Sequence, residues 1–125
     1  MRSNVPISEK RMSFLVEKLE VYQKALDVAE AISKLTEAFP RGQFYLADQL
    51  NRAATSIAAN IAEGNGRYHK PERANFFRIS RGSAFECVPL LELARRKNLV
   101  TSAQHKVLYD QLESISKMLS ALVPT

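Results

Sequence analysis

Apolar side chains recur every three or four residues along most of the chain, and this spacing constrains the fold more than any other feature. Such a spacing places the side chains on one face of an α-helix, whereas a half-buried strand needs an apolar residue at every second position. No run of β-branched residues alternates with polar ones. The sequence therefore predicts an all-α fold.

Helix breakers and start signals divide the pattern into four segments. The first predicted helix runs from about Ser13 to the stop at Pro40 and Gly42, the second from about Phe44 to Glu63, the third from Pro71 to about Lys97, and the fourth follows Thr101. Pro71 suits the first position of a helix, where its missing N–H costs nothing. Thr101 and Gln104 have the spacing of a capping box.

Each segment has a stripe of side chains that we expect to face the core. The stripes are Leu15, Leu19, Tyr22, Leu26, Ala29 and Ile32; then Leu46, Leu50, Ala54, Ile57 and Ile61; then Phe76, Ile79, Ser83, Cys87, Leu90 and Ala94; and last Leu108, Leu112, Ile115, Leu119 and Leu122. Pro89 should kink or break the third helix. Gly82 should gain a close contact with the Ala-rich second helix that offsets its poor helix propensity.

Four amphipathic helices with short connections favour an antiparallel up-down-up-down four-helix bundle. A chain of 125 residues suits one domain. We place this bundle domain at residues 15–125, preceded by a flexible N-terminal tail at residues 1–14, where no period is visible. Either Met1 or Met12 could be the natural start.

The sequence offers no apparatus for catalysis, and we predict that the protein is not an enzyme. Cys87 is the single cysteine and lies on an apolar stripe, which favours a buried structural thiol over a nucleophile. Neither the Glu-x-x-His pairs of a di-iron bundle nor a glycine-rich phosphate loop occurs. We therefore expect no metal and no cofactor. An enzyme would instead predict a pocket with a perturbed titratable group.

The first eleven residues are polar, and no stretch of about 18 consecutive apolar residues occurs anywhere. These features predict neither a signal peptide nor a transmembrane helix. We expect a cytoplasmic protein with no membrane partner.

The charge distribution is the most informative functional feature. The chain has 18 Lys and Arg against 13 Asp and Glu, a net charge of +5, which makes nucleic acid a reasonable partner. One basic cluster consists of Arg67, Lys70, Arg73, Arg78 and Arg81, and a second of Arg95, Arg96 and Lys97. His69 and the possible stacking surface of Tyr68 lie within the first cluster, which only Glu72 opposes. The alternative is a solvated helix face, with the second cluster merely complementing a helix dipole.

Polar residues also recur inside the predicted core region. Ser56, Asn60 and Glu63 share one side of the second helix, and Gly82, Ser83 and Glu86 are similarly placed on the third. We interpret them, together with Arg52 of the second helix, mainly as a satisfied polar network that fixes helix register. A ligand pocket between the helices is the alternative.

Several stretches of the chain resemble a known bacterial family. They are Leu19–Ala25 (LEVYQKA), Phe39–Pro40, Leu46–Gly64 (LADQLNRAATSIAANIAEG) and Gly82–Glu86 (GSAFE). They are similar to the bacterial four-helix-bundle proteins also called the ribosomal RNA intervening-sequence protein family, some of which are encoded inside insertions in large-subunit ribosomal RNA genes. The resemblance spans about Val16 to Val123.

This resemblance implies a four-helix protomer that assembles into a ring-shaped homopentamer. One branch of the family, the accessory protein of diversity-generating retroelements, is a basic barrel that binds nucleic acid and the element's reverse transcriptase. The residues matching the family pattern, which we expect to be mainly architectural, are Arg52, Ser56, Asn60, Glu63, Gly64, Gly82, Ser83 and Glu86. The chain departs from the pattern at Gln43–Ala47 and at Pro89.

Two functional hypotheses follow. The first is a non-enzymatic oligomeric protein that binds nucleic acid, with structured RNA favoured over DNA, through phosphate contacts of both basic clusters. The alternative is a protein–protein adaptor that docks a partner enzyme such as a reverse transcriptase.

Overall fold

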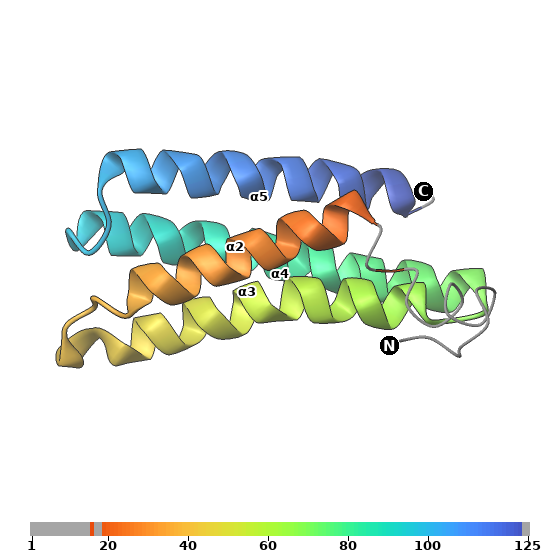
Figure 1. Ribbon diagram of the computed structural model, residues 1–125, viewed down its shortest axis with the longest axis horizontal. Helices are drawn as coiled ribbons and strands as arrows, with labels where there is room; N and C mark the ends of the chain where they lie inside the picture. The colour runs from red at the N-terminus through yellow and green to blue at the C-terminus, as the bar shows by residue number, and fades with distance from the viewer. Residues whose placement is uncertain (1–15, 17–18, 124–125) are drawn as a thin grey trace, which may run out of the picture.

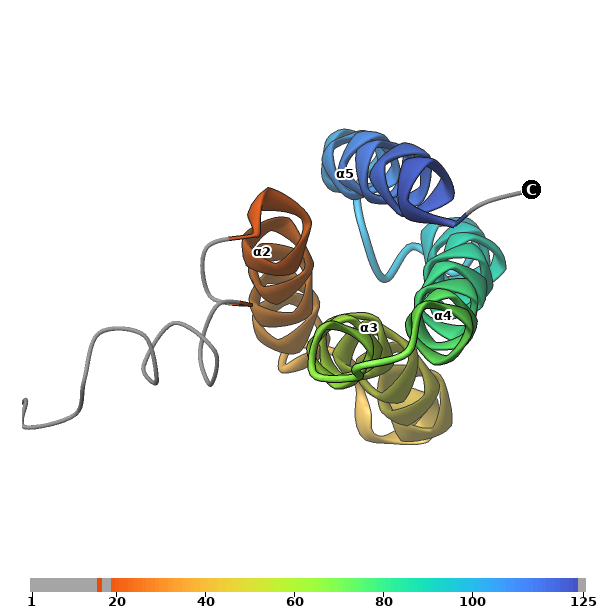
Figure 2. The ribbon, with the colours of Figure 1, turned by 90° about the vertical axis from the view of Figure 1, so that its right-hand side faces the viewer.

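The protein, seen in a computed structural model, is described at residue 16 and residues 19–123. Four α-helices form this part: α2 (Glu20–Thr36), α3 (Phe44–Asn65), α4 (Lys70–Arg96) and α5 (Ser102–Leu122), with a short 3₁₀ helix, η2 (Arg41–Gln43), before α3. Successive helices run in opposite directions (Figure 1), and seen end-on they surround a common interior (Figure 2). The part of the chain described contains no strand, so the predicted all-α four-helix fold is confirmed.

The ends of the helices follow the expected chemistry with small shifts. The capping box is present, because the Gln104 N–H donates to the Thr101 Oγ1 at 3.0 Å and the Thr101 N–H donates to the Gln104 side chain at 2.8 Å. Pro71 is the second residue of α4 rather than the first. The predicted tail at residues 1–14, which includes the expected helix start at Ser13, lies outside the described residues, and so does Leu15 of the first predicted stripe.

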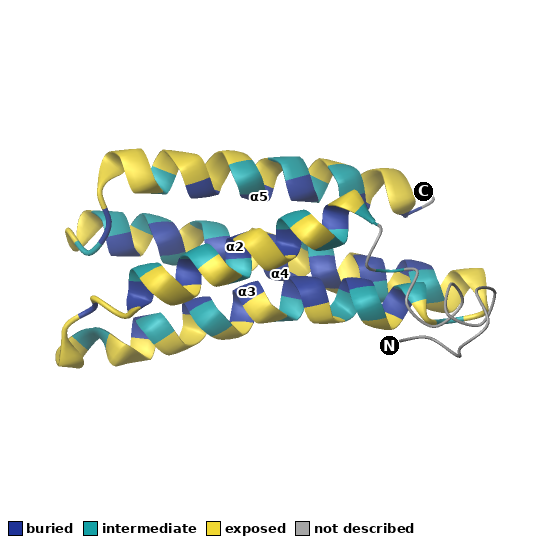
Figure 3. Ribbon diagram, viewed as in Figure 1, coloured by how far each residue is buried: buried dark blue, intermediate teal, exposed yellow. Residues whose placement is uncertain are grey.

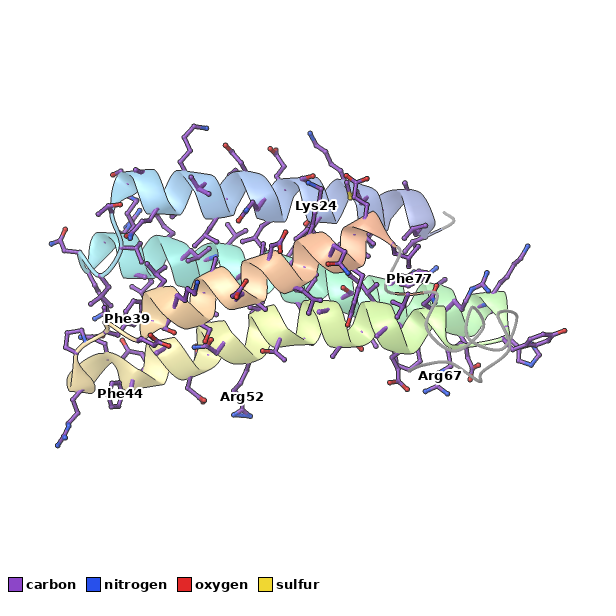
Figure 4. The ribbon with its side chains drawn as sticks, in the orientation of Figure 1. Lys24, Phe39, Phe44, Arg52, Arg67 and Phe77 are labelled. Atoms are coloured by element: carbon purple, nitrogen blue, oxygen red, sulfur yellow. The ribbon has the colours of Figure 1, made fainter. Side chains whose placement is uncertain are left out.

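The core consists of the inward faces of all four helices (Figure 3). The stripe predicted for α3 is buried throughout, and in α5 only the final residue, Leu122, is exposed instead. Phe39 and Phe77 lie toward opposite ends of the molecule (Figure 4), and both are buried. In the described part of the chain no helix is both long and apolar enough to span a membrane.

The stripes predicted for α2 and α4 were partly wrong. The buried side chains of α2 are Val21, Ala25, Val28, Ile32 and Thr36, and those of α4 are Ala74, Phe77, Ser80, Ser83, Ala84, Cys87, Leu91 and Ala94. Leu26 and Ile79 are exposed, while Tyr22, Phe76 and Leu90 are half-buried. The error arose because the large apolar residues were assigned to the core, whereas closely packed helices bury many small ones.

The break considered at Pro89 and the close contact expected at Gly82 are both absent. α4 continues as one helix from Lys70 to Arg96 with Pro89 inside it, and a kink at Pro89 stays a prediction. Phe85 and Pro89 both lie on the exposed face of α4. Because proline has no N–H, the Phe85 carbonyl lacks its helical hydrogen bond, and on this face water can replace it. A Cβ added at Gly82 would meet no atom within 4 Å, so Gly82 makes no close contact with α3. That role belongs to Gly64, where an added Cβ would lie 2.9 Å from Phe77 Cε1.

Candidate functional site

The first basic cluster lies at the end of the bundle where α3 turns into α4. We call Arg67, Lys70, Arg73, Arg78 and Arg81 the basic end. Arg67 is held on the α3 side of the turn (Figure 4): its Nη2 donates to Glu63 Oε2 at 2.7 Å, and its guanidinium lies 4.8 Å from the centre of the Phe76 ring. Its charge is therefore already balanced by Glu63.

The other four cations of the basic end belong to the first half of α4. Lys70, Arg78 and Arg81 have the i, i+8, i+11 spacing that places residues on one side of a helix. Arg81 donates to Ser120 Oγ of α5 at 3.2 Å, which locates this side of α4 beside the end of α5. Lys70 and Arg78 are exposed, and among the described residues the side chains of Lys70, Arg73 and Arg78 have no hydrogen bond or ion pair. The basic end thus has three cations whose side chains have no partner among the described residues, and a fourth, Arg81, whose one side-chain partner is a neutral hydroxyl.

The second basic cluster lies at the opposite end of α4. The 27 residues of this helix span about 40 Å, so the two clusters cannot form one small site in a single protomer. Glu92 Oε2 accepts from Arg95 Nη2 at 2.7 Å and from Arg96 Nε at 3.0 Å, whereas Lys97 is exposed at the end of the helix. The hydrogen bonds from Arg95 and Arg96 lower the pKa of the Glu92 carboxyl from 4.5 to about 2. Both arginines are therefore already paired with Glu92 within the last turns of α4.

The predicted polar network is present in part. The Ser56 and Ser83 hydroxyls lie 2.8 Å apart, and Asn60 Nδ2 donates to Ser56 Oγ at 2.9 Å. Ser80, which sequence reasoning missed, is fully buried and donates to the Ile57 carbonyl at 2.8 Å. The bonds of Ser83 and Ser80 link α4 to α3, and all three bonds satisfy polar groups at the contact of the two helices.

Three predicted members of the network lie elsewhere. Arg52 points away from the bundle (Figure 4) and pairs with Asp48 at 3.5 Å, both side chains being well exposed. Glu63 holds Arg67, and Glu86 is exposed. The depression beside the network is lined by α3 residues alone, from Asn51 to Asn60, so it does not open between the two helices.

Cys87, which the sequence analysis weighed as a nucleophile, is buried. Burial raises the pKa of the Cys87 thiol to about 12, with a smaller contribution from Glu86, so Cys87 stays protonated at neutral pH. No group of three His, Cys, Asp or Glu side chains in residues 16 and 19–123 could hold a metal ion. His69 is exposed in the turn, and His105 Nε2 lies 3.5 Å from Glu92 Oε1.

The structure also reveals a groove that sequence reasoning missed. It lies between α4 and α5, has a volume of about 580 Å³, and is mostly apolar, with Phe85, Val88, Pro89, Tyr109 and Leu112 in its lining. Lys117 and Ser120 line it as well, so it reaches the α5 residue that Arg81 contacts. The sequence contains one signal of this groove: Phe85 and Pro89 are apolar, lie four residues apart and fall outside the predicted core stripe.

Comparison with known proteins finds one family model and a solved structure that match most of the chain. The sequence model of the 23S rRNA-intervening sequence protein family matches residues 17–121. A crystal structure from Bacteroides thetaiotaomicron, described as a protein of unknown function from the S23 ribosomal protein family, is 28% identical with a TM-score of 0.77. The similarity covers 84% of this chain and 99% of that one. No curated protein matches the chain.

Proposed function

Because the chain belongs to the 23S rRNA-intervening sequence protein family, we propose that it is a non-enzymatic protein that binds nucleic acid, RNA in preference to DNA, through its basic end. The observation that carries the proposal is the group of cations without partners among the described residues, Lys70, Arg73 and Arg78, beside Arg81. Arginine and lysine at such a surface can contact phosphate without first breaking an ion pair.

The two clusters contribute differently to this proposal. Lys70, Arg73, Arg78 and Arg81 are the principal contacts, while Arg67 is shared with Glu63. Arg95 and Arg96 would have to give up Glu92 to bind phosphate, and only Lys97 of that cluster is available without such an exchange. Four phosphate contacts to a duplex predict that log K falls against log salt with a slope of roughly −3 to −4.

The test is fluorescence anisotropy with a labelled structured RNA and a DNA duplex of matched length over a salt series. We expect a triple variant, Arg73→Glu, Arg78→Glu and Arg81→Glu, to lose binding while keeping its helical circular dichroism. The matched control reverses three exposed cations elsewhere, with Lys34→Glu, Arg52→Glu and Lys106→Glu, and should retain most of the affinity. Equal losses in both variants would indicate a net-charge effect, and full binding by the folded first variant would overturn the assignment.

We further propose that the protomers assemble into a ring-shaped homopentamer. Support comes from the exposed apolar side chains of α4, which include Ile79, Phe85 and Leu93 and would cost free energy if left in water. A ring would present five basic ends to one nucleic acid and so raise the overall affinity.

The alternative function is a protein–protein adaptor, and the groove between α4 and α5 favours it. A partner protein would then cover Phe85, Pro89 and Tyr109, and the positive charge would serve the partner's substrate. A reverse transcriptase gene beside the coding gene would support this alternative, as would failure to bind any nucleic acid at low salt.

A further inference from the structure

Tyr68 is the most exposed large hydrophobic side chain among the described residues. It is 89% exposed, compared with 61% for the next, Phe85. It lies in the turn between α3 and α4, and its one ring contact within the described part of the chain is an edge-on approach of His69, with ring centres 5.2 Å apart and planes at 82°. The phenol ring therefore has nearly all of its surface available to a ligand.

The fold does not account for this aromatic residue. Tyr68 adds nothing to the core, and the residues beside it in the turn, Arg67 and His69, are polar. An isolated ring with polar neighbours does not form the apolar pocket that a peptide side chain would need. A planar surface with cations beside it suits a nucleotide, which supplies both an aromatic base and a phosphate.

The neighbouring side chains are arranged for such a ligand. Immediately before Tyr68 in the chain, the Arg67 guanidinium is fixed by Glu63 and by the Phe76 ring, so it does not compete for the tyrosine ring. Two residues after Tyr68, Lys70 begins α4, and its side chain is exposed without a partner among the described residues. A strand whose base lies on Tyr68 can thus place a phosphate near Lys70.

We propose that Tyr68 stacks on an unpaired base, so that the protein prefers RNA containing a loop, a bulge or a single-stranded end over fully paired RNA. The proposal rests on the proposed nucleic-acid binding and specifies its substrate class. A base inside a duplex is stacked on both faces and cannot reach a protruding ring, whereas unpaired bases of structured RNA can.

Affinity for two labelled RNAs tests the proposal: a hairpin with an unpaired loop and a blunt duplex with the same number of phosphates. We expect tighter binding of the hairpin by the wild-type protein. Tyr68→Ala should weaken hairpin binding by about 5- to 150-fold, leave duplex binding and the salt slope unchanged, and keep the thermal midpoint of unfolding. Tyr68→Phe, which retains the ring, should restore hairpin binding.

A spectroscopic measurement reports stacking directly, because the chain contains no tryptophan. In Tyr68→Trp, the single indole should lose fluorescence when the hairpin binds and keep it when the duplex binds. Tyr45→Trp, an exposed position at the opposite end of α3, is the control and should respond to neither.

The outcomes separate this inference from the function it rests on. If the wild-type protein binds neither RNA at low salt, both are overturned. If it binds hairpin and duplex equally, or if Tyr68→Ala binds the hairpin as well as wild type does, the stacking role alone is overturned and phosphate binding stands.

Discussion

Gly64 and Gly82 show how the same residue type can have opposite roles in one bundle. Both lie inside helices, where glycine is about 1 kcal/mol less favourable than alanine. At Gly64 an added Cβ would lie 2.9 Å from Phe77 Cε1 and 3.0 Å from Phe76 Cβ, whereas at Gly82 it would meet nothing within 4 Å. Gly64 therefore allows α3 and α4 to pack closely, and Gly82 has no such role within the protomer.

Alanine substitutions should separate these roles. Gly82→Ala should stabilise the protein by about 0.5–1 kcal/mol, because helix propensity improves and no atom is displaced. Gly64→Ala should destabilise it by about 1 kcal/mol, because moving the buried Phe77 ring costs more than the propensity returns. Urea unfolding followed by circular dichroism measures both free energies. A Gly64→Ala protein more stable than wild type would contradict the tight contact.

At the scale of the element, α3 could be predicted from sequence and α4 only in part. The inward side of α3 has large apolar residues at regular spacing, such as Leu46, Leu50 and Ile57, so hydrophobic period and burial agree. In α4 the buried side includes Ser80 and Ala84, while the larger Ile79 and Phe85 face outward. In α4, therefore, the larger apolar side chains do not mark the buried face. The hydrogen bond from Ser80 to the Ile57 carbonyl joins α4 to α3, and the hydrophobic period of α4 does not specify which helix packs against it.

The last turn of α4 gives a prediction about pH. Hydrogen bonds from Arg95 and Arg96 hold the pKa of Glu92 at about 2 in the folded protein, below its ordinary value of 4.5. A lowered folded pKa means that the charged carboxylate adds stability above about pH 4.5 and loses that contribution as the pH falls toward 2. The Glu92→Gln protein should therefore unfold at a lower temperature than wild type at about pH 6, and the difference should shrink to near zero by about pH 2.

The thermal midpoints of unfolding of wild type and Glu92→Gln, measured between about pH 6 and about pH 2, test this prediction. The other carboxylates titrate alike in both proteins, so their contributions cancel in the difference between the two midpoints. A difference that stays constant with pH would contradict the lowered pKa of Glu92. His105, 3.5 Å from the same carboxylate, links the turn to α5, so the substitution also tests whether this end of the α4–α5 pair depends on the charge.

At the scale of the whole molecule, the antiparallel order of the helices determines which basic residues lie close enough to act together. The class of fold follows from the period and the breakers, because four amphipathic helices with short connections have few alternatives. The arrangement of the site does not, since Arg81 and Ser120 are 39 positions apart and meet only when α4 and α5 lie side by side. By contrast, Glu92 lies three and four residues before Arg95 and Arg96 on one helix, so its two ion pairs follow from sequence spacing alone.

Assembly is the remaining property of the whole molecule, and Phe85 is the residue to test it with. Its side chain is exposed in the protomer and lines the groove between α4 and α5, so Phe85→Glu should leave the helical circular dichroism intact. Multi-angle light scattering should give five times the 14.1 kDa chain mass for wild type and a lower mass for the variant, because a buried charge would oppose association.

The control is Tyr45→Glu, which places the same charge on an exposed aromatic position at the start of α3 and should keep the wild-type mass. A wild-type protein that stays monomeric at micromolar concentration would reject the ring. If wild type and Phe85→Glu both form pentamers, the groove faces outward in the ring and is open to a partner, which would strengthen the adaptor alternative. If Phe85→Glu is monomeric and also binds RNA more weakly, the five basic ends act together on one nucleic acid, as multivalent binding requires.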